Sequence, residues 1–300
     1  MASVKSVKKR RSTADIIFLT INYVLLIICC IIVLYPIYYM FIISISDGYA
    51  VLRGEVKFFP VGINFSSYKA VLESPDIPKS YLNTVIYTVV GTFINVAMTA
   101  MCAYPLSRKK FFGRNVFAFM IIFTMFFDAG MIANFMVVDQ LNLTNKIWAI
   151  VLPGAINAWY MVIMRTFFQQ IPEEIYESAH LDGAGDFVIF GKIVLPLSVP
   201  TIMTMVLFYA VGHWNSWFNA LIYLDDKAKY PVQLIMRNIV LSGETAALSS
   251  SAASMSQDVG IVATNVKYAV VFVTMLPILL VYPFIQKYFV KGIMVGALKG

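Results

Sequence analysis

Charged side chains are scarce in this chain, and their scarcity excludes an ordinary soluble domain. Asp, Glu, Lys and Arg make up 13% of its 300 residues, hydrophobic residues make up 60%, and the mean hydropathy is +0.77. Soluble domains carry about 25% charged residues. A composition this apolar is typical of integral membrane proteins.

Cysteine and histidine are also rare, which excludes several kinds of site. Cys29, Cys30 and Cys102 lie in apolar runs without ligand spacing, so neither a disulfide framework nor a zinc site is expected. The two histidines, His180 and His213, fall in distant segments, and the chain contains neither His-Glu-x-x-His nor Gly-x-Ser-x-Gly. The sequence therefore predicts no metal site and no enzyme.

A nucleotide-binding loop is missing as well. Such a loop needs Gly, four residues and then Gly-Lys-Ser/Thr, so that backbone amides surround the phosphates and a hydroxyl reaches magnesium. The nearest stretch runs from Gly185 to Gly191-Lys192, with five intervening residues, and continues with Ile193 instead of a hydroxyl. We therefore expect no cofactor in this chain, and any ATP-derived energy must come from another subunit.

Long uncharged runs are abundant. The first, from Ile16 to Ser46, covers 31 residues. That exceeds the roughly 20 needed to span a bilayer and the roughly 7–15 of a signal-peptide core, so we expect it to be retained. The sequence predicts an all-α integral membrane protein whose residues 16–286 form six transmembrane helices, at 16–46, 80–107, 115–138, 147–164, 193–224 and 261–286.

Lys and Arg are distributed unevenly between the two sides that six helices define. The side that holds both termini carries 14 of the 23, and nine of these lie close to the first three helices. Basic loops mark the cytoplasmic side. We therefore expect residues 1–15, 171–192 and 287–300 in the cytoplasm and the loops 47–79 and 225–260 outside. The net charge of +7 then serves topology, and no nucleic-acid partner is expected.

One acidic stretch, residues 171–192, interrupts the apolar chain. Pro172, Glu173 and Glu174 suit the first turn of a helix, and Gly183 is a natural C-terminal stop. A second helix would begin near Asp186 and continue towards Pro196. The pattern predicts a helix-turn-helix on the membrane surface that presents an acidic face to a partner.

The spacing of this stretch resembles the EAA loop of permease subunits in binding-protein-dependent ABC importers. That loop reads Glu-x-Ala, three residues, Gly, nine residues, Ile-x-Leu-Pro, and Ser178 stands here where alanine is usual. The resemblance implies a type I ABC importer permease fold in which this hairpin couples to a cytoplasmic ATPase subunit. The coupling residues would be Glu177, Ser178, Ala179, Asp182, Gly183, Ile193, Leu195 and Pro196.

Other stretches are similar to carbohydrate-uptake permeases, closest to the oligosaccharide permeases typical of Gram-positive bacteria. They are Asn83-Thr84 and the ranges 103–108, 165–168, 214–218, 230–233 and 237–238. The resemblance implies a multi-pass subunit in a bacterial cell membrane that forms half of an oligosaccharide pathway. Its partners would be membrane lipid, a homologous second permease, two ATPase subunits that bind ATP and Mg, and an extracellular sugar-binding lipoprotein, which the loop 225–260 would meet.

The tail 287–300 resembles the glycine-rich C-terminal tail of the second permease of maltose-type importers. In that subunit the tail inserts between the two ATPase subunits. The resemblance therefore implies contacts to the ATPases from Gly292, Gly296, Lys299 and Gly300.

Polar and aromatic residues inside the predicted spans are candidates for the pathway. Asp128 is the one charge clearly inside a predicted span, and because a charge at the bilayer centre is costly, it should face the helix bundle or a wet cavity. It is either a pathway or gate residue, or a carboxylate that lies at a helix end or is paired by neighbouring polar groups. Trp214 and Trp217, three apart, would share a helix face and either stack on a sugar or belong to an aromatic belt. The full set of candidates is Asp128, Asn134, Trp214, Asn215, Trp217 and Asn219.

The alternative to an oligosaccharide permease is the permease of an ABC importer for a non-sugar solute, or a secondary transporter.

Overall fold

The computed structural model describes residues 12–249, 265–281 and 283, all of which are helical or irregular with no strand. The chain divides into two compact units, residues 1–70 with 250–272 and residues 71–249 with 273–300. Each unit is described separately. The tail 287–300 lies outside the described residues, as do residues 1–11 and 250–264.

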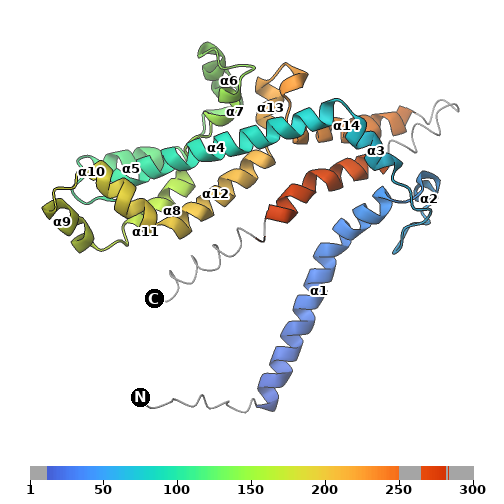
Figure 1. Ribbon diagram of the computed structural model, residues 1–300, viewed down its shortest axis with the longest axis horizontal. Helices are drawn as coiled ribbons and strands as arrows, with labels where there is room; N and C mark the ends of the chain where they lie inside the picture. The colour runs from blue at the N-terminus through green and yellow to red at the C-terminus, as the bar shows by residue number, and fades with distance from the viewer. Residues whose placement is uncertain (1–11, 250–264, 282, 284–300) are drawn as a thin grey trace. The chain divides into compact units, whose positions relative to one another are not determined.

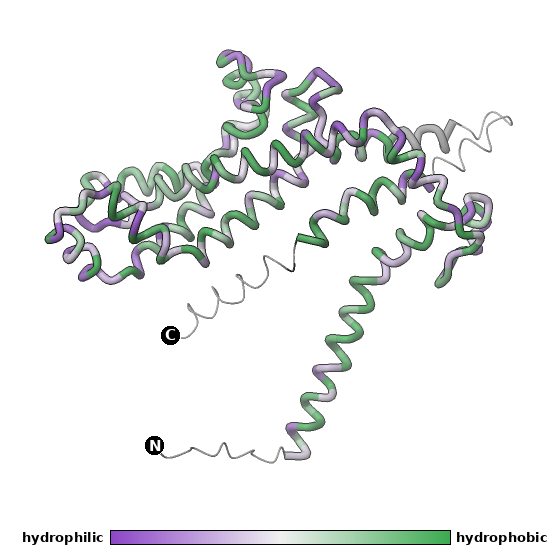
Figure 2. Tube along the Cα trace, viewed as in Figure 1, coloured by the Kyte–Doolittle hydropathy of each residue, from purple (hydrophilic) through white to green (hydrophobic). Residues whose placement is uncertain are grey.

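The first unit is dominated by α1 (Thr13–Ser44), a helix of 32 residues without a charge after its first turn. Figure 2 shows α1 as almost uniformly hydrophobic, and its most apolar stretch is exposed in the isolated chain. Its C-terminal end leads to α2 (Gly48–Leu52) and α3 (Ser66–Glu73). There Ile42, Ile43, Ala50 and Val56 form a small core, so the loop 47–79 carries structure of its own.

The second unit is built around α4 (Asp76–Ser107), against which several of its other helices pack (Figure 1). Its main partners are α12 and α8, and their shared core includes Tyr104, Met161, Met164, Phe168 and Met205. The remaining elements include α5 (Arg114–Phe123), α6 (Gly130–Gln140), α7 (Ile147–Val151), α8 (Ala158–Phe168), α9 (Glu173–Leu181), α10 (Asp186–Ile189), a π-helix (Phe190–Val194), α11 (Leu195–Leu197), α12 (Val199–Trp214), α13 (Phe218–Tyr223), a 3₁₀ turn (Lys227–Lys229) and α14 (Val232–Ser249).

Three of the predicted continuous spans are broken. The run 115–138 is divided between α5 and α6, the run 147–164 between α7 and α8, and the run 193–224 bends by 81° before α12 and ends its main helix at Trp214. Gly130 (φ +80°) lies at the first break and Pro153 at the second. Within the described residues, α1 and α4 are long and apolar enough to cross a membrane, and the bent pair provides a third such segment.

Side chains from neighbouring helices satisfy the backbone at the second break. The amide of Asn95 on α4 donates to the carbonyl of Gly154 (3.3 Å), and the hydroxyl of Tyr209 on α12 accepts from the N–H of Asn157 (3.0 Å). Thr99 on α4 shares a hydrogen bond of 2.7 Å with Tyr209. Non-helical backbone is tolerated at membrane depth only where protein or water satisfies it, so this polar face of α4 makes the break in the fourth run stable.

The described part of the polar region 225–260 contains a helix. This helix is α14, which has 18 residues. The N–H of Val232 donates to the hydroxyl of Thr84 (2.8 Å) on α4. The buried positions Val232 and Leu234 also hold the start of α14 in the second unit.

Candidate functional site

The acidic stretch forms the predicted helix-turn-helix at the end of the second unit where α4 terminates (Figure 1). Helix α9 ends in a Schellman motif, in which the N–H of Gly183 donates to the carbonyl of His180 (3.0 Å) and the N–H of Ala184 to that of Ala179 (2.9 Å). Gly183 has φ +78°, a conformation that side chains with a Cβ disfavour. The predicted stop at Gly183 is confirmed, as is a second helix that begins at Asp186.

The inner face of α9 is fixed to the core by Tyr176, which is 1% exposed, and Ala179. The guanidinium of Arg108, just after α4, lies 3.4 Å from the centroid of the Tyr176 ring and 2.7 Å from a carboxylate oxygen of Glu173. Burial raises the pKa of Tyr176, which remains a neutral phenol under Arg108. We call Arg108, Glu173 and Tyr176 the hairpin clamp. In the sequence, the basic turn after α4 was the feature that could have indicated this clamp, but we used it only to assign the cytoplasmic side of the membrane.

The outer face of the hairpin is exposed and partly apolar. Glu177, Ser178 and Asp182 are exposed, as predicted for an acidic face. Leu181 and Phe187, on the two sides of the turn at Gly183, are 89% and 92% exposed. Large apolar side chains that are this exposed mark an interaction surface when they lie together. Phe187 is not among the residues that define the sequence motifs described above.

The hairpin is not packed against the core on all sides. A cavity of about 650 Å³ lies between the segment after α4 and the second half of the hairpin. Its lining includes Lys110, Phe112, His180, Asp186 and Phe187. The hairpin is thus held on its Tyr176 side and faces open space on its Phe187 side.

The second half of the motif, Ile193, Leu195 and Pro196, lies in an irregular helix. A π-helix covers Phe190–Val194, and the chain then bends by 81° around Ser198 before α12 begins. Insertions of this type occur often at functional sites. Val194 is buried in the core while Ile193 and Leu195 pack against it, so these residues join the hairpin to α12.

The proposed pathway residues come from several elements. Asp128 is exposed at the break between α5 and α6, where its carboxylate accepts from the N–H of Gly130 (2.6 Å). A carboxylate at a helix end makes a bond of this kind, and Asn134 is exposed on the same helix, α6. Contact of either residue with a cargo remains a prediction.

The expectation that Trp214 and Trp217 share a helix face is wrong, because α12 ends at Trp214. Trp214 is buried, and its indole N–H donates to the carbonyl of Thr274 (3.3 Å). Trp217 lies beyond the break and is 36% exposed. Asn215 is exposed, with its amide bonded to the carbonyl of Val211 (2.9 Å), and Asn219 is half-buried in α13.

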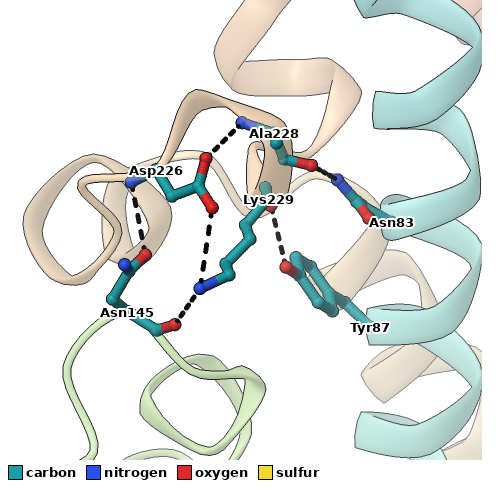
Figure 3. A network of polar contacts seen from close by, with 6 residues as sticks. All are labelled: Asn83, Tyr87, Asn145, Asp226, Ala228 and Lys229. Atoms are coloured by element: carbon teal, nitrogen blue, oxygen red, sulfur yellow. Dashed lines mark hydrogen bonds and ion pairs between the residues drawn. The ribbon is translucent and has the colours of Figure 1, made fainter.

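A polar network fixes the turn between α13 and α14 (Figure 3). Asn83 and Tyr87 of α4 donate to the backbone carbonyls of Ala228 (2.9 Å) and Lys229 (2.8 Å), respectively. The ammonium of Lys229 donates to the carbonyl of Asn145 (2.9 Å) and lies 3.7 Å from Asp226. The turn is therefore held from two directions, and the cation of Lys229 is already neutralised.

Comparison with known proteins identifies the family of this chain. Residues 1–295 match the family described as "Binding-protein-dependent transport system inner membrane component". The chain belongs to this family. Members of the permease family do not hydrolyse ATP themselves, and separate subunits perform that reaction. The family also identifies the chain as a membrane component, in agreement with its apolar helices.

Two relatives of this permease come from Bacillus subtilis (strain 168). The "Polygalacturonan/rhamnogalacturonan transport system permease protein YtcP" is 42% identical over 269 residues, which cover 87% of this chain and 92% of the relative. "Protein LplC" is 40% identical over 242 residues, or 81% of each chain.

A solved structure is similar over almost the whole permease. It is titled "Crystal structure of a bacterial ABC transporter involved in the import of the acidic polysaccharide alginate". The similarity has a TM-score of 0.82 and 36% identity, and it covers 94% of this chain and 100% of that one. The fold is therefore that of an ABC importer permease.

Proposed function

We propose that this permease carries an acidic oligosaccharide, one that contains uronic acid units, into a bacterial cell. The observation that carries the proposal is that two similar proteins, at 42% and 36% identity, are named for systems that transport polygalacturonan and alginate. Both polymers consist of sugars that bear carboxylates. Permeases for neutral sugars are also among the relatives, but at lower identity, such as 27% for a maltodextrin permease.

The permease pairs with a homologous second permease to enclose one pathway, and two ATPase subunits each receive one hairpin. The exposed side chains of Leu181 and Phe187 support this docking, because a partner would cover both. An extracellular sugar-binding lipoprotein delivers the cargo to the end that carries α13 and α14. This arrangement requires six spans, with both termini and the hairpin in the cytoplasm, and it places ATP and Mg in the partner subunits.

The hairpin transmits movement as a short lever. When ATP closes the ATPase subunits, α9 moves with its partner, and Gly183 allows the turn to pivot against the helix that leads to α12. The clamp ties the same movement to the end of α4 through Arg108. Since α4 and α12 form the centre of the second unit, a shift at the hairpin reaches the helices that line the pathway.

The test is to tag the chain in its native membrane, solubilise it gently and identify what co-purifies. The proposal expects a second permease and an ATPase, and ATP hydrolysis that rises when the binding protein arrives loaded with trigalacturonate. Stimulation by a neutral trisaccharide such as maltotriose, but not by trigalacturonate, would show that the cargo assignment is wrong. Stimulation by a peptide or amino acid alone would exclude a sugar.

A further inference from the structure

Arg237 lies on the indole ring of Trp217 beside the break between α12 and α13. The central carbon of its guanidinium is 4.7 Å from the centroid of the ring. The ring of Phe218 is perpendicular to that of Trp217 at 5.5 Å. Trp217 and Phe218 are 36% and 47% exposed, and Arg237 is half-buried. A cation and two partly open aromatic rings are thus brought together from segments about 20 residues apart in the sequence.

Apart from its contact with Trp217, the guanidinium of Arg237 has no polar partner among the described residues. Of the carboxylates that the structure describes, none forms an ion pair with Arg237, and no described side chain or carbonyl accepts a hydrogen bond from it. The nearby lysines differ in this respect. Lys227 pairs with Asp76 at 2.5 Å, and Lys229 is held by Asn145 and Asp226 (Figure 3). Among the described residues between α13 and the middle of α14, Arg237, unlike Lys227 and Lys229, therefore has its N–H groups available for an external anion.

Stacking prepares the guanidinium for a carboxylate. When the flat face of the guanidinium lies on an indole, the N–H groups around its edge stay free to donate. A carboxylate accepts two of these bonds in a parallel arrangement that a hydroxyl does not reproduce. A half-buried, unpaired charge is costly, so an anionic ligand gains free energy here that a neutral one does not.

We propose that Arg237, positioned by Trp217, forms a subsite that recognises the carboxylate of a uronic acid unit of the cargo. The C–H face of the sugar ring lies along the exposed part of Trp217 or Phe218, and the carboxylate accepts from Arg237. The inference rests on the proposed function, because it assigns to this end of the permease a specificity for acidic sugars.

The experiment uses the complete importer in proteoliposomes with its binding protein. Import of trigalacturonate and of its fully methyl-esterified form is measured at equal occupancy of the binding protein, so that the preference of the permease itself is isolated. We expect Arg237→Gln to reduce import of the acid on the order of 10- to 100-fold, which is the loss of one or two charge-assisted hydrogen bonds. Import of the ester should change by less than about twofold, and Arg237→Lys should recover part of the acid import because it keeps the charge.

The matched control is Lys227→Gln, which removes a positive charge from the same end of the chain without touching Trp217. It should leave the ratio of acid to ester import unchanged. If Arg237→Gln lowers both substrates equally, or if Lys227→Gln has the same effect as Arg237→Gln, the subsite is wrong while the proposed cargo stands. If the unaltered importer does not carry trigalacturonate at all, the proposed function fails and this inference with it.

Discussion

The hairpin clamp should determine how firmly α9 is held to the end of α4. Arg108→Met keeps a flexible, unbranched apolar side chain but removes both the ion pair to Glu173 and the cation–π contact to Tyr176. The side chain of Arg108 is 18% exposed and that of Glu173 is 38% exposed, so the ion pair lies between a surface pair of at most about 1 kcal/mol and a buried one. The cation–π contact adds about 0.5–2 kcal/mol. The substitution should therefore weaken local attachment of α9 by about 2 kcal/mol.

Hydrogen exchange in the assembled importer measures this attachment directly. A loss of about 2 kcal/mol corresponds to exchange about 30-fold faster, and it should be confined to the amides of residues 173–184. Lys110→Met is the matched control, because Lys110 is exposed in the same basic turn and pairs with no described carboxylate. In a double-mutant cycle, Arg108→Met and Glu173→Gln should be coupled by about 1 kcal/mol. Equal exchange in Arg108→Met and Lys110→Met would refute the clamp.

Three further substitutions, one of them with a matched control, test separate parts of the structure. In Gly183→Pro, the proline cannot adopt the φ of +78° and has no N–H to donate to His180. The purified complex should therefore assemble and hydrolyse ATP, but without import. Import that stays coupled to ATP hydrolysis would contradict the proposed lever movement of the hairpin. Gly91→Ala would place its Cβ 2.5 Å from the ring of His213, so the free energy of unfolding should fall by about 1–3 kcal/mol, measured as a lower melting temperature. Gly212→Ala is the matched control, because its Cβ would meet open space, and it should cost less than 1 kcal/mol. Asp128→Asn should leave the melting temperature nearly unchanged, because an amide oxygen can still accept the hydrogen bond from the N–H of Gly130. If the carboxylate faces the cargo, import should fall. Unchanged import of every cargo would make Asp128 a structural residue.

The acidic hairpin could be predicted from the sequence because its signals are local. The carboxylates of its first turn, the glycine stop and the spacing to Pro196 all lie within 25 residues, and the structure confirms the start and end of α9. The long helix α4 was predicted for a similar reason, since an uncharged run of this length has few other stable conformations in a membrane.

The broken spans could not be predicted from hydropathy, which counts apolar residues and ignores hydrogen bonds between distant segments. The break at Gly154 depends on Asn95, 59 residues earlier, and on Tyr209, 52 residues after Asn157. The same limit applies to the clamp, where Arg108 and Glu173 are 65 residues apart. The prediction that Trp214 and Trp217 share a helix face was wrong because residues three apart share a face only within a continuous helix, and the helix ends at Trp214.

ATP-dependent import into proteoliposomes tests the central claim most directly. The tagged chain is reconstituted with its co-purified partners and the loaded binding protein, and radiolabelled trigalacturonate is followed in the lumen. The account predicts uptake that requires ATP and the binding protein, and that stops when the ATPase subunits are omitted. Uptake by this chain alone, driven by an ion gradient without ATP, would contradict the account and the role assigned to the hairpin.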